Sequence, residues 1–63
     1  MLRVGTMLYG YCGGNFSRDS YEDKRVEALG SDWVVVRNAN SGLPEFADCA
    51  PEDLEEYTED KTL

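Results

Sequence analysis

The sequence predicts a mainly β fold, a small antiparallel sheet of about four strands with a short C-terminal helix. Residues 25–29 and 33–37 are rich in β-branched and aromatic side chains, which suit a pleated, half-buried surface. They flank Gly30-Ser31-Asp32, a composition typical of a tight turn. Near the end of the chain, a proline followed by acidic residues indicates the start of a helix. Trp33 is expected in the core of this hairpin, and an exposed binding anchor is the alternative.

The segment before the hairpin divides into a strand and a long loop. Residues 2–11 are expected to form the first strand, although glycines interrupt its alternation. Residues 12–23 form the loop, in which Gly13-Gly14 is a turn signal. Because long loops in small domains commonly pack on the domain itself, we expect this one to fold over the sheet and to shield Phe16 and Tyr21 from solvent.

The segment after the hairpin completes the sheet and adds the helix. Residues 43–48 are expected to form a short strand with Phe46 in the core. A helix of one to two turns follows, so that one β-rich domain spans residues 1–57 and an acidic frayed tail spans residues 58–63. This order of elements is reminiscent of a small SH3-like barrel. A curled β-meander closed by a C-terminal helix is the alternative.

The length of 63 residues limits the core that the chain can build. A domain of this size buries only about 60% of the surface that its unfolded chain exposes, so its stability is expected to be marginal. Small domains commonly gain stability from a disulfide, a metal ion or a partner subunit. An edge strand and a small core are therefore compatible with a homodimer.

Histidine is absent from the chain, and the two cysteines are Cys12 and Cys49. These counts exclude the commonest zinc sites and any Ser-His or Cys-His nucleophile pair. We therefore expect no catalytic, metal-binding or cofactor-binding residue and no enzymatic activity. The first twelve residues lack the apolar stretch of a secretory signal, which indicates a cytoplasmic protein. We expect two mostly buried thiols, and a disulfide or a reactive Cys12 are the alternatives.

The formal net charge of −7 is concentrated in the last third of the chain. Residues 1–44 carry five basic and five acidic side chains, whereas residues 45–63 carry eight acidic side chains and one lysine. Phosphate binding requires clustered Lys and Arg, so direct binding of nucleic acid is not expected, and no segment is apolar enough to cross a membrane. An acidic end suits a basic protein partner, and a solvated surface is the alternative.

The candidate partner-binding residues lie in the loop around residues 12–21 and in the acidic end. In the loop, the alternative is a structural role, with Phe16 in the core and a local ion pair between Arg18 and Asp19. The candidates are Tyr11, Phe16, Arg18, Asp19, Tyr21, Glu52, Asp53, Glu55 and Glu56.

Two segments carry a resemblance to a known group of proteins. The first is Tyr-Gly-Tyr-Cys-Gly-Gly-Asn-Phe-Ser-Arg-Asp-Ser-Tyr at residues 9–21, and the second is Lys-Arg-Val-Glu-Ala-Leu-Gly-Ser-Asp-Trp-Val-Val-Val-Arg at residues 24–37. Together they resemble small uncharacterised proteins encoded by bacteriophages of actinobacteria and in some cases by their hosts. The similarity covers about residues 4–46. It implies a viral accessory protein acting inside a bacterial cell, and it brings no functional residues with it.

These observations predict a small non-enzymatic binding module that acts on a bacterial host protein through the loop, the acidic end, or both. The alternative is an acidic nucleic-acid mimic that competes for a basic DNA- or RNA-binding groove. A small enzyme or thiol protein using Cys12 is disfavoured, because most acid–base sites use histidine and a formed pocket.

Overall fold

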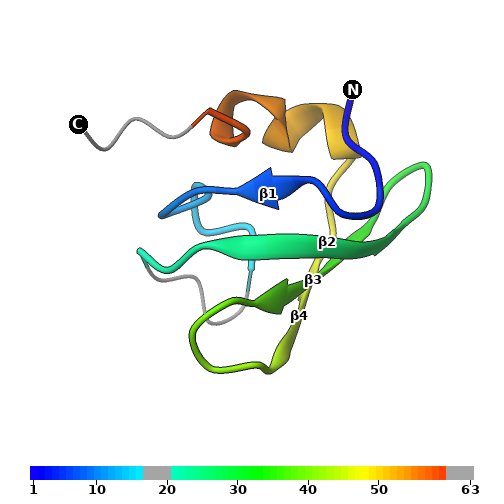
Figure 1. Ribbon diagram of the computed structural model, residues 1–63. Helices are drawn as coiled ribbons and strands as arrows, with labels where there is room; N and C mark the ends of the chain where they lie inside the picture. The colour runs from blue at the N-terminus through cyan, green and yellow to red at the C-terminus, as the bar shows by residue number, and fades with distance from the viewer. Residues whose placement is uncertain (17–20, 60–63) are drawn as a thin grey trace.

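One antiparallel sheet carries the fold, with its four strands in the order β1-β2-β3-β4 (Figure 1). The computed structural model describes residues 1–16 and 21–59. The strands are β1 (Met7–Leu8), β2 (Lys24–Leu29), β3 (Val34–Asn38) and β4 (Pro44–Ala47), and the 3₁₀ helix η1 (Pro51–Tyr57) follows them. The predicted mainly β fold with a short C-terminal helix is confirmed.

The β2–β3 hairpin forms where the sequence predicts it. Val26 lies opposite Val36, and Leu29 lies opposite Val34. Trp33 belongs to the turn and not to the strand, since its carbonyl oxygen accepts a 2.9 Å hydrogen bond from the Gly30 amide. The prediction that Trp33 lies in the core is wrong, because its half-buried indole packs over Gly30 instead.

Side chains that alternate along the strands build the core on the inward face of the sheet. Leu8 of β1 and Val26 of β2 point inward, as do Val34 and Val36 of β3. Helix η1 lies over this face (Figure 1), and its Leu54 belongs to the core. The buried apolar residues are Leu2, Leu8, Cys12, Phe16, Val26, Val34, Val36, Ala47 and Leu54.

The loop after β1 brings the two edges of the sheet together. β1 lies at one edge, and the chain then crosses the inward face to Phe16, which forms an isolated antiparallel bridge with Ala47 of β4 at the other edge. Phe16 is only 2% exposed. For residues 12–16, the expected packing of the loop over the sheet is confirmed, and the alternative structural role of Phe16 is the one observed.

The first strand is much shorter than the sequence predicts. Residues 2–11 were expected to be extended, but only Met7 and Leu8 pair as a strand. Gly5 and Gly10 have φ values of +93° and +69°, which turn the chain away from an extended path on either side. The result is a short edge strand.

Phe46 is not a core residue, and this part of the prediction is wrong. Its side chain is 52% exposed, whereas Glu45 and Ala47 on either side of it are buried. Phe46 pairs with Val35 on the outer face of the sheet. The side-chain period of a strand is two, so this register turns Ala47 inward and Phe46 outward.

Helix η1 shows the residue spacing of a 3₁₀ helix. Pro51 and Leu54 are buried and Tyr57 is partly buried, and these residues are three apart, the spacing at which side chains of a 3₁₀ helix align. The helix ends at Thr58, whose amide and hydroxyl both donate to the Glu55 carbonyl oxygen. The expected tail at 58–63 is described only for its first two residues.

One end of the inward face is polar. Lys24 lies between Leu8 and Asn38 in the pairing register, and both Lys24 and Asn38 are buried. Asn38 donates from Nδ2 to the carboxylates of Glu22 and Glu45 at 3.2 and 3.4 Å. Buried polar groups of this kind require hydrogen-bond partners, so this end of the core is fixed by directional contacts as well as by packing.

Candidate binding surfaces

The turn at Gly13–Gly14 lies close to the hydroxyl groups of Tyr57 and Tyr11. Both glycines have positive φ, and the Asn15 amide donates to the Cys12 carbonyl oxygen across the turn. A Cβ atom at Gly13 would lie 2.7 Å from the hydroxyl of Tyr57, and one at Gly14 would lie 2.9 Å from the hydroxyl of Tyr11. Glycine is therefore needed here for conformation and for space.

Tyr11 and Tyr21 form a ring pair at the surface. Their ring centroids are 5.5 Å apart with an interplanar angle of 33°, a separation typical of interacting aromatic side chains. Tyr11 is 44% exposed and Tyr21 is 84% exposed. The expectation that Tyr21 is shielded from solvent is wrong, because its ring packs on Tyr11 at the surface.

Lys24 holds the backbone next to each tyrosine of this ring pair. Its Nζ donates to the carbonyl oxygens of Gly10 and Glu22 at 2.9 Å each, and these residues are the immediate neighbours of Tyr11 and Tyr21. Nζ also lies 5.7 Å from the centroid of the Phe16 ring, within the range of a cation–π contact. The position of Tyr11 relative to Tyr21 is therefore set from inside the core.

The acidic candidates lie on the outer side of η1. Glu52, Asp53, Glu55 and Glu56 are all exposed, because Pro51, Leu54 and Tyr57 occupy the inward positions. Glu55 makes a 3.3 Å ion pair with the N-terminal ammonium group. Since Tyr57 lies against Gly13, the acidic helix adjoins the loop that carries Tyr11.

The acidic helix also affects Cys49. Burial raises the pKa of the Cys49 thiol above its ordinary value of 9.0, and the neighbouring carboxylates of Asp53 and Asp48 raise it further. Both cysteines are thiols in the structure, Cys12 buried and Cys49 partly buried. A raised pKa lowers the thiolate fraction, so Cys49 is a weak nucleophile at neutral pH.

The predicted binding residues fall into three groups. Tyr11, Tyr21 and the four acidic residues of η1 are exposed and available to a partner. Phe16 is buried and cannot touch a partner directly, so its inclusion among the contact residues is wrong. Arg18 and Asp19 lie outside the described residues.

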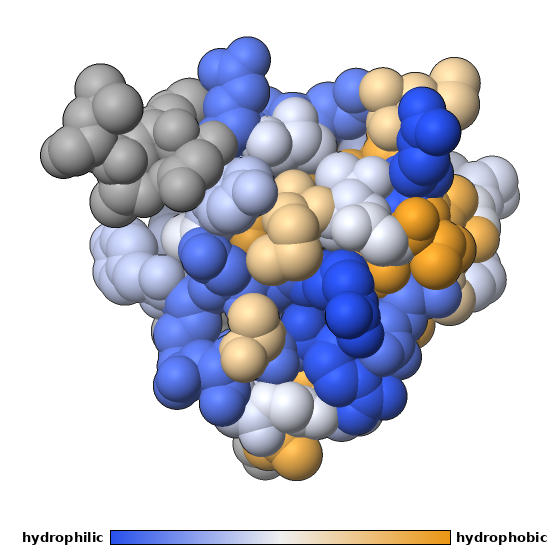
Figure 2. Space-filling model, viewed as in Figure 1, coloured by the Kyte–Doolittle hydropathy of each residue, from blue (hydrophilic) through white to orange (hydrophobic). Residues whose placement is uncertain are grey.

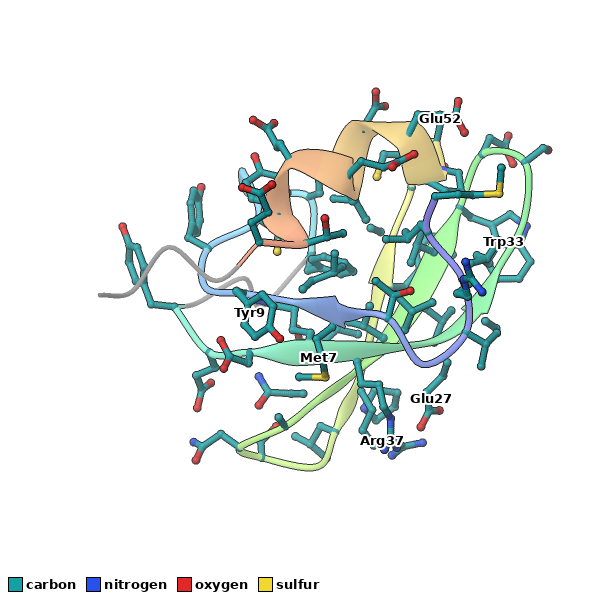
Figure 3. The ribbon with its side chains drawn as sticks, turned by 45° about the horizontal axis from the view of Figure 1, so that its top comes forward. Met7, Tyr9, Glu27, Trp33, Arg37 and Glu52 are labelled. Atoms are coloured by element: carbon teal, nitrogen blue, oxygen red, sulfur yellow. The ribbon has the colours of Figure 1, made fainter. Side chains whose placement is uncertain are left out.

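The outer face of the sheet carries a cluster that the sequence interpretation missed. Arg25 and Arg37 lie directly opposite each other on β2 and β3, and Met7 of β1 lies beside Arg25. A register shift between Val26 and Ala28 marks a β-bulge at Glu27. Glu27 follows Arg25 by two residues, so it lies on the same outer face, beside Arg37 (Figure 3).

Glu27 and Arg37 form a two-point ion pair. Nε and Nη2 of Arg37 donate to Oε1 and Oε2 of Glu27 at 2.7 and 3.1 Å. The hydrogen bond from Arg37 holds the pKa of the Glu27 carboxyl below its ordinary value of 4.5, although partial burial opposes this effect. Strand alternation and the pairing register could have revealed the cluster, whereas a count of charges along the chain could not.

The acidic side of η1 and the pair of Glu27 and Arg37 lie on different sides of the molecule. Figure 3 shows Glu52 on the helix at one side and the pair of Glu27 and Arg37 at the other. Figure 2 shows mostly hydrophilic surface over β1 and β2, interrupted by separate apolar spots.

The residues within 1–16 and 21–59 include no group of three or more His, Cys, Asp and Glu side chains that could hold a metal ion. No helix in that same part of the chain has the length and apolar character to cross a membrane.

Comparison with protein families, with characterised proteins and with solved structures finds no match to this chain.

Proposed function

We propose that this protein is a small non-enzymatic binding module that engages a protein partner through the Tyr11–Tyr21 ring pair and the adjoining acidic side of η1. The main support is an exposed aromatic pair, in which the backbone next to each ring is hydrogen-bonded to the same buried lysine. Tyrosine offers a large, rigid contact area and a polar hydroxyl, and it is enriched at protein interfaces. Fixing the pair before binding lowers the entropy lost on association.

The chemistry of these surfaces favours a basic partner. Four exposed carboxylates lie on η1, and Tyr57 at the end of this helix contacts the Gly13–Gly14 turn. Complementary charge speeds the encounter with a partner and selects its orientation. The resemblance to phage-encoded proteins supports a bacterial host protein as the partner, met in the host cytoplasm.

The test is affinity capture from bacterial host lysate with the tagged full chain, read by quantitative mass spectrometry. The double variant Tyr11→Ala/Tyr21→Ala removes the ring pair, and Phe46→Ala is the matched control because it removes an exposed aromatic ring from the outer face. We expect one partner to be enriched by the native chain and by Phe46→Ala but not by the double variant. Equal recovery by all three forms would contradict the proposal.

A second candidate is an acidic mimic that competes for a nucleic-acid-binding groove, and the exposed carboxylates of η1 support it. Such binding would weaken steeply with ionic strength, because it depends on exposed charges. Neutralising Glu52, Asp53, Glu55 and Glu56 to the amides would abolish it, whereas the double tyrosine variant would retain it. Binding that resists salt and requires the tyrosines supports the first candidate over the second.

A further inference from the structure

The outer face of the sheet holds a pocket of about 310 Å³ between three strands and the β3–β4 turn. Its volume is at the lower end of the range for small-ligand sites. Two guanidinium groups, a thioether and small residues of the turn surround it. The lining residues are Met7, Arg25, Arg37, Asn38, Ala39 and Gly42.

The two arginines of this pocket share one carboxylate. Arg37 is held by Glu27 at two points and donates from Nη1 to the Gly42 carbonyl oxygen at 2.8 Å. Nη2 of Arg25 lies 3.9 Å from Oε1 of Glu27, which is too long for a hydrogen bond. Two positive charges therefore face one negative charge.

Arg25 is the group with capacity for a ligand. Its side chain is 58% exposed, and within the described part of the chain its guanidinium has no closer ion-pair partner than Glu27. Like charges directly opposite each other on neighbouring strands are destabilising, and an anion placed between them relieves the repulsion. Glu22 and Asp23, the nearest acidic residues before β2 in the sequence, are not among the lining residues.

We propose that this pocket binds a single oxyanion, a phosphate or carboxylate group, with Arg25 as its main contact. The planar guanidinium donates two parallel hydrogen bonds to such groups. Arg37 is already oriented by Glu27 and Gly42, and it adds a second positive charge. Glu27 competes with the ligand for both arginines. The site lies away from the acidic side of η1, since Figure 3 shows Glu52 on one side of the molecule and Arg37 on the other.

The test is titration of the ¹⁵N-labelled full chain with inorganic phosphate and, separately, with acetate, followed by NMR. Sodium chloride at matched ionic strength is the control for general screening. We expect saturable shifts of the Arg25 side-chain Nε–H signal and of the Met7, Ala39 and Gly42 amides. Saturation by phosphate alone assigns the site to phosphate groups, and saturation by acetate alone assigns it to carboxylates.

Three variants make the proposal falsifiable. Arg25→Gln should weaken binding by about ten-fold or more, the loss expected for one charge-assisted contact. Glu27→Gln should tighten binding, because it removes the competing charge and keeps an oxygen that accepts from Arg37. Arg3→Gln, an equal charge change at an exposed position outside the pocket, should leave binding unchanged.

Three results would overturn the proposed oxyanion site. Shifts that grow linearly with added salt, or that chloride reproduces, would show that no oxyanion site exists. Equal weakening by Arg25→Gln and Arg3→Gln would show that only net charge matters. Weaker binding by Glu27→Gln would overturn the competing role of Glu27. The amide spectrum of each variant without ligand checks that the fold is retained.

Discussion

The ammonium group of Lys24 donates a hydrogen bond to the carbonyl oxygen of Gly10 at 2.9 Å, and the entire lysine side chain is buried. Lysine is almost never fully buried without partners. Here the same group also donates to the Glu22 carbonyl oxygen. One side chain thus connects the backbone just after β1 to the backbone just before β2.

Replacement of Lys24 by methionine should lower the free energy of unfolding by about 1–3 kcal/mol, because two backbone carbonyls lose a charged donor. The Tyr11–Tyr21 pair should also lose its fixed geometry. Chemical denaturation gives the stability, and NMR line shapes of the tyrosine rings report the pair. Arg25→Met, at an exposed position on the same strand, is the control and should change stability little. Equal effects of the two substitutions would contradict the structural role of Lys24.

Gly30→Ala should destabilise the β2–β3 hairpin by about 1–3 kcal/mol, the usual cost of inserting a group into an occupied space. A Cβ atom at this position would overlap the indole ring of Trp33, so the indole would have to move. Denaturation followed by tryptophan fluorescence measures both the stability and the displacement. Ser31→Ala changes an exposed residue of the same turn and should be nearly neutral.

The two phenylalanines should respond very differently to truncation. Phe16→Ala removes a buried ring and should cost about 3–5 kcal/mol, which is enough to unfold a marginal domain. Phe46→Ala removes a ring that is 52% exposed and should cost about 1 kcal/mol or less. Thermal denaturation by circular dichroism measures both. A larger loss for Phe46→Ala would mean that the register of β4 is wrong.

The pH dependence of stability should include a contribution from Glu27. Because the folded-state pKa of Glu27 lies below its ordinary value of 4.5, the ion pair with Arg37 stabilises the fold above that pH. This contribution is lost as the pH falls through the lowered pKa. Glu27→Gln should therefore flatten the acid side of a stability profile measured by denaturation. Asp32→Asn, an equal charge change in the exposed hairpin turn, is the control.

Cys49 should react slowly with iodoacetamide near neutral pH, because burial and the carboxylates of Asp53 and Asp48 raise its pKa. Peptide mapping by mass spectrometry distinguishes its alkylation from that of Cys12, which is buried and should react only after unfolding. Asp53→Asn should accelerate the reaction of Cys49. Glu52→Gln is the matched charge change, and an equal acceleration by it would contradict the specific effect of Asp53.

The sequence was sufficient for the hairpin and the helix, because both depend on local signals. β-branched runs on either side of a turn, and a proline before acidic residues, express their preferences within a few residues. The inward or outward direction of Phe46 depends instead on the register of β4 against β3, and a shift of one residue reverses it. The shortening of the first strand likewise depended on how Gly5 and Gly10 turn the chain.

The candidate surfaces were less predictable than the strands. The exposed carboxylates of η1 follow from composition and helical spacing. The pairing of Tyr11 with Tyr21 lies next to two backbone contacts of a buried lysine, and a lysine at the start of a strand gives no sign in the sequence that it points inward. The arrangement of Arg25, Arg37 and Glu27 follows from strand alternation and from the register of β2 against β3, which a count of charges along the chain does not consider.

The bridge between Phe16 and Ala47 has a consequence for the order of folding. The β2–β3 hairpin joins residues close together in the chain, so it can form at a small cost in loop entropy. The bridge joins two distant segments, and its Ala47 also pairs with Val34 of β3. Contacts between distant segments are slow to form. The bridge between Phe16 and Ala47 is therefore expected to form last during folding. Its amide protons should be the first of the sheet to exchange with solvent when the native protein opens.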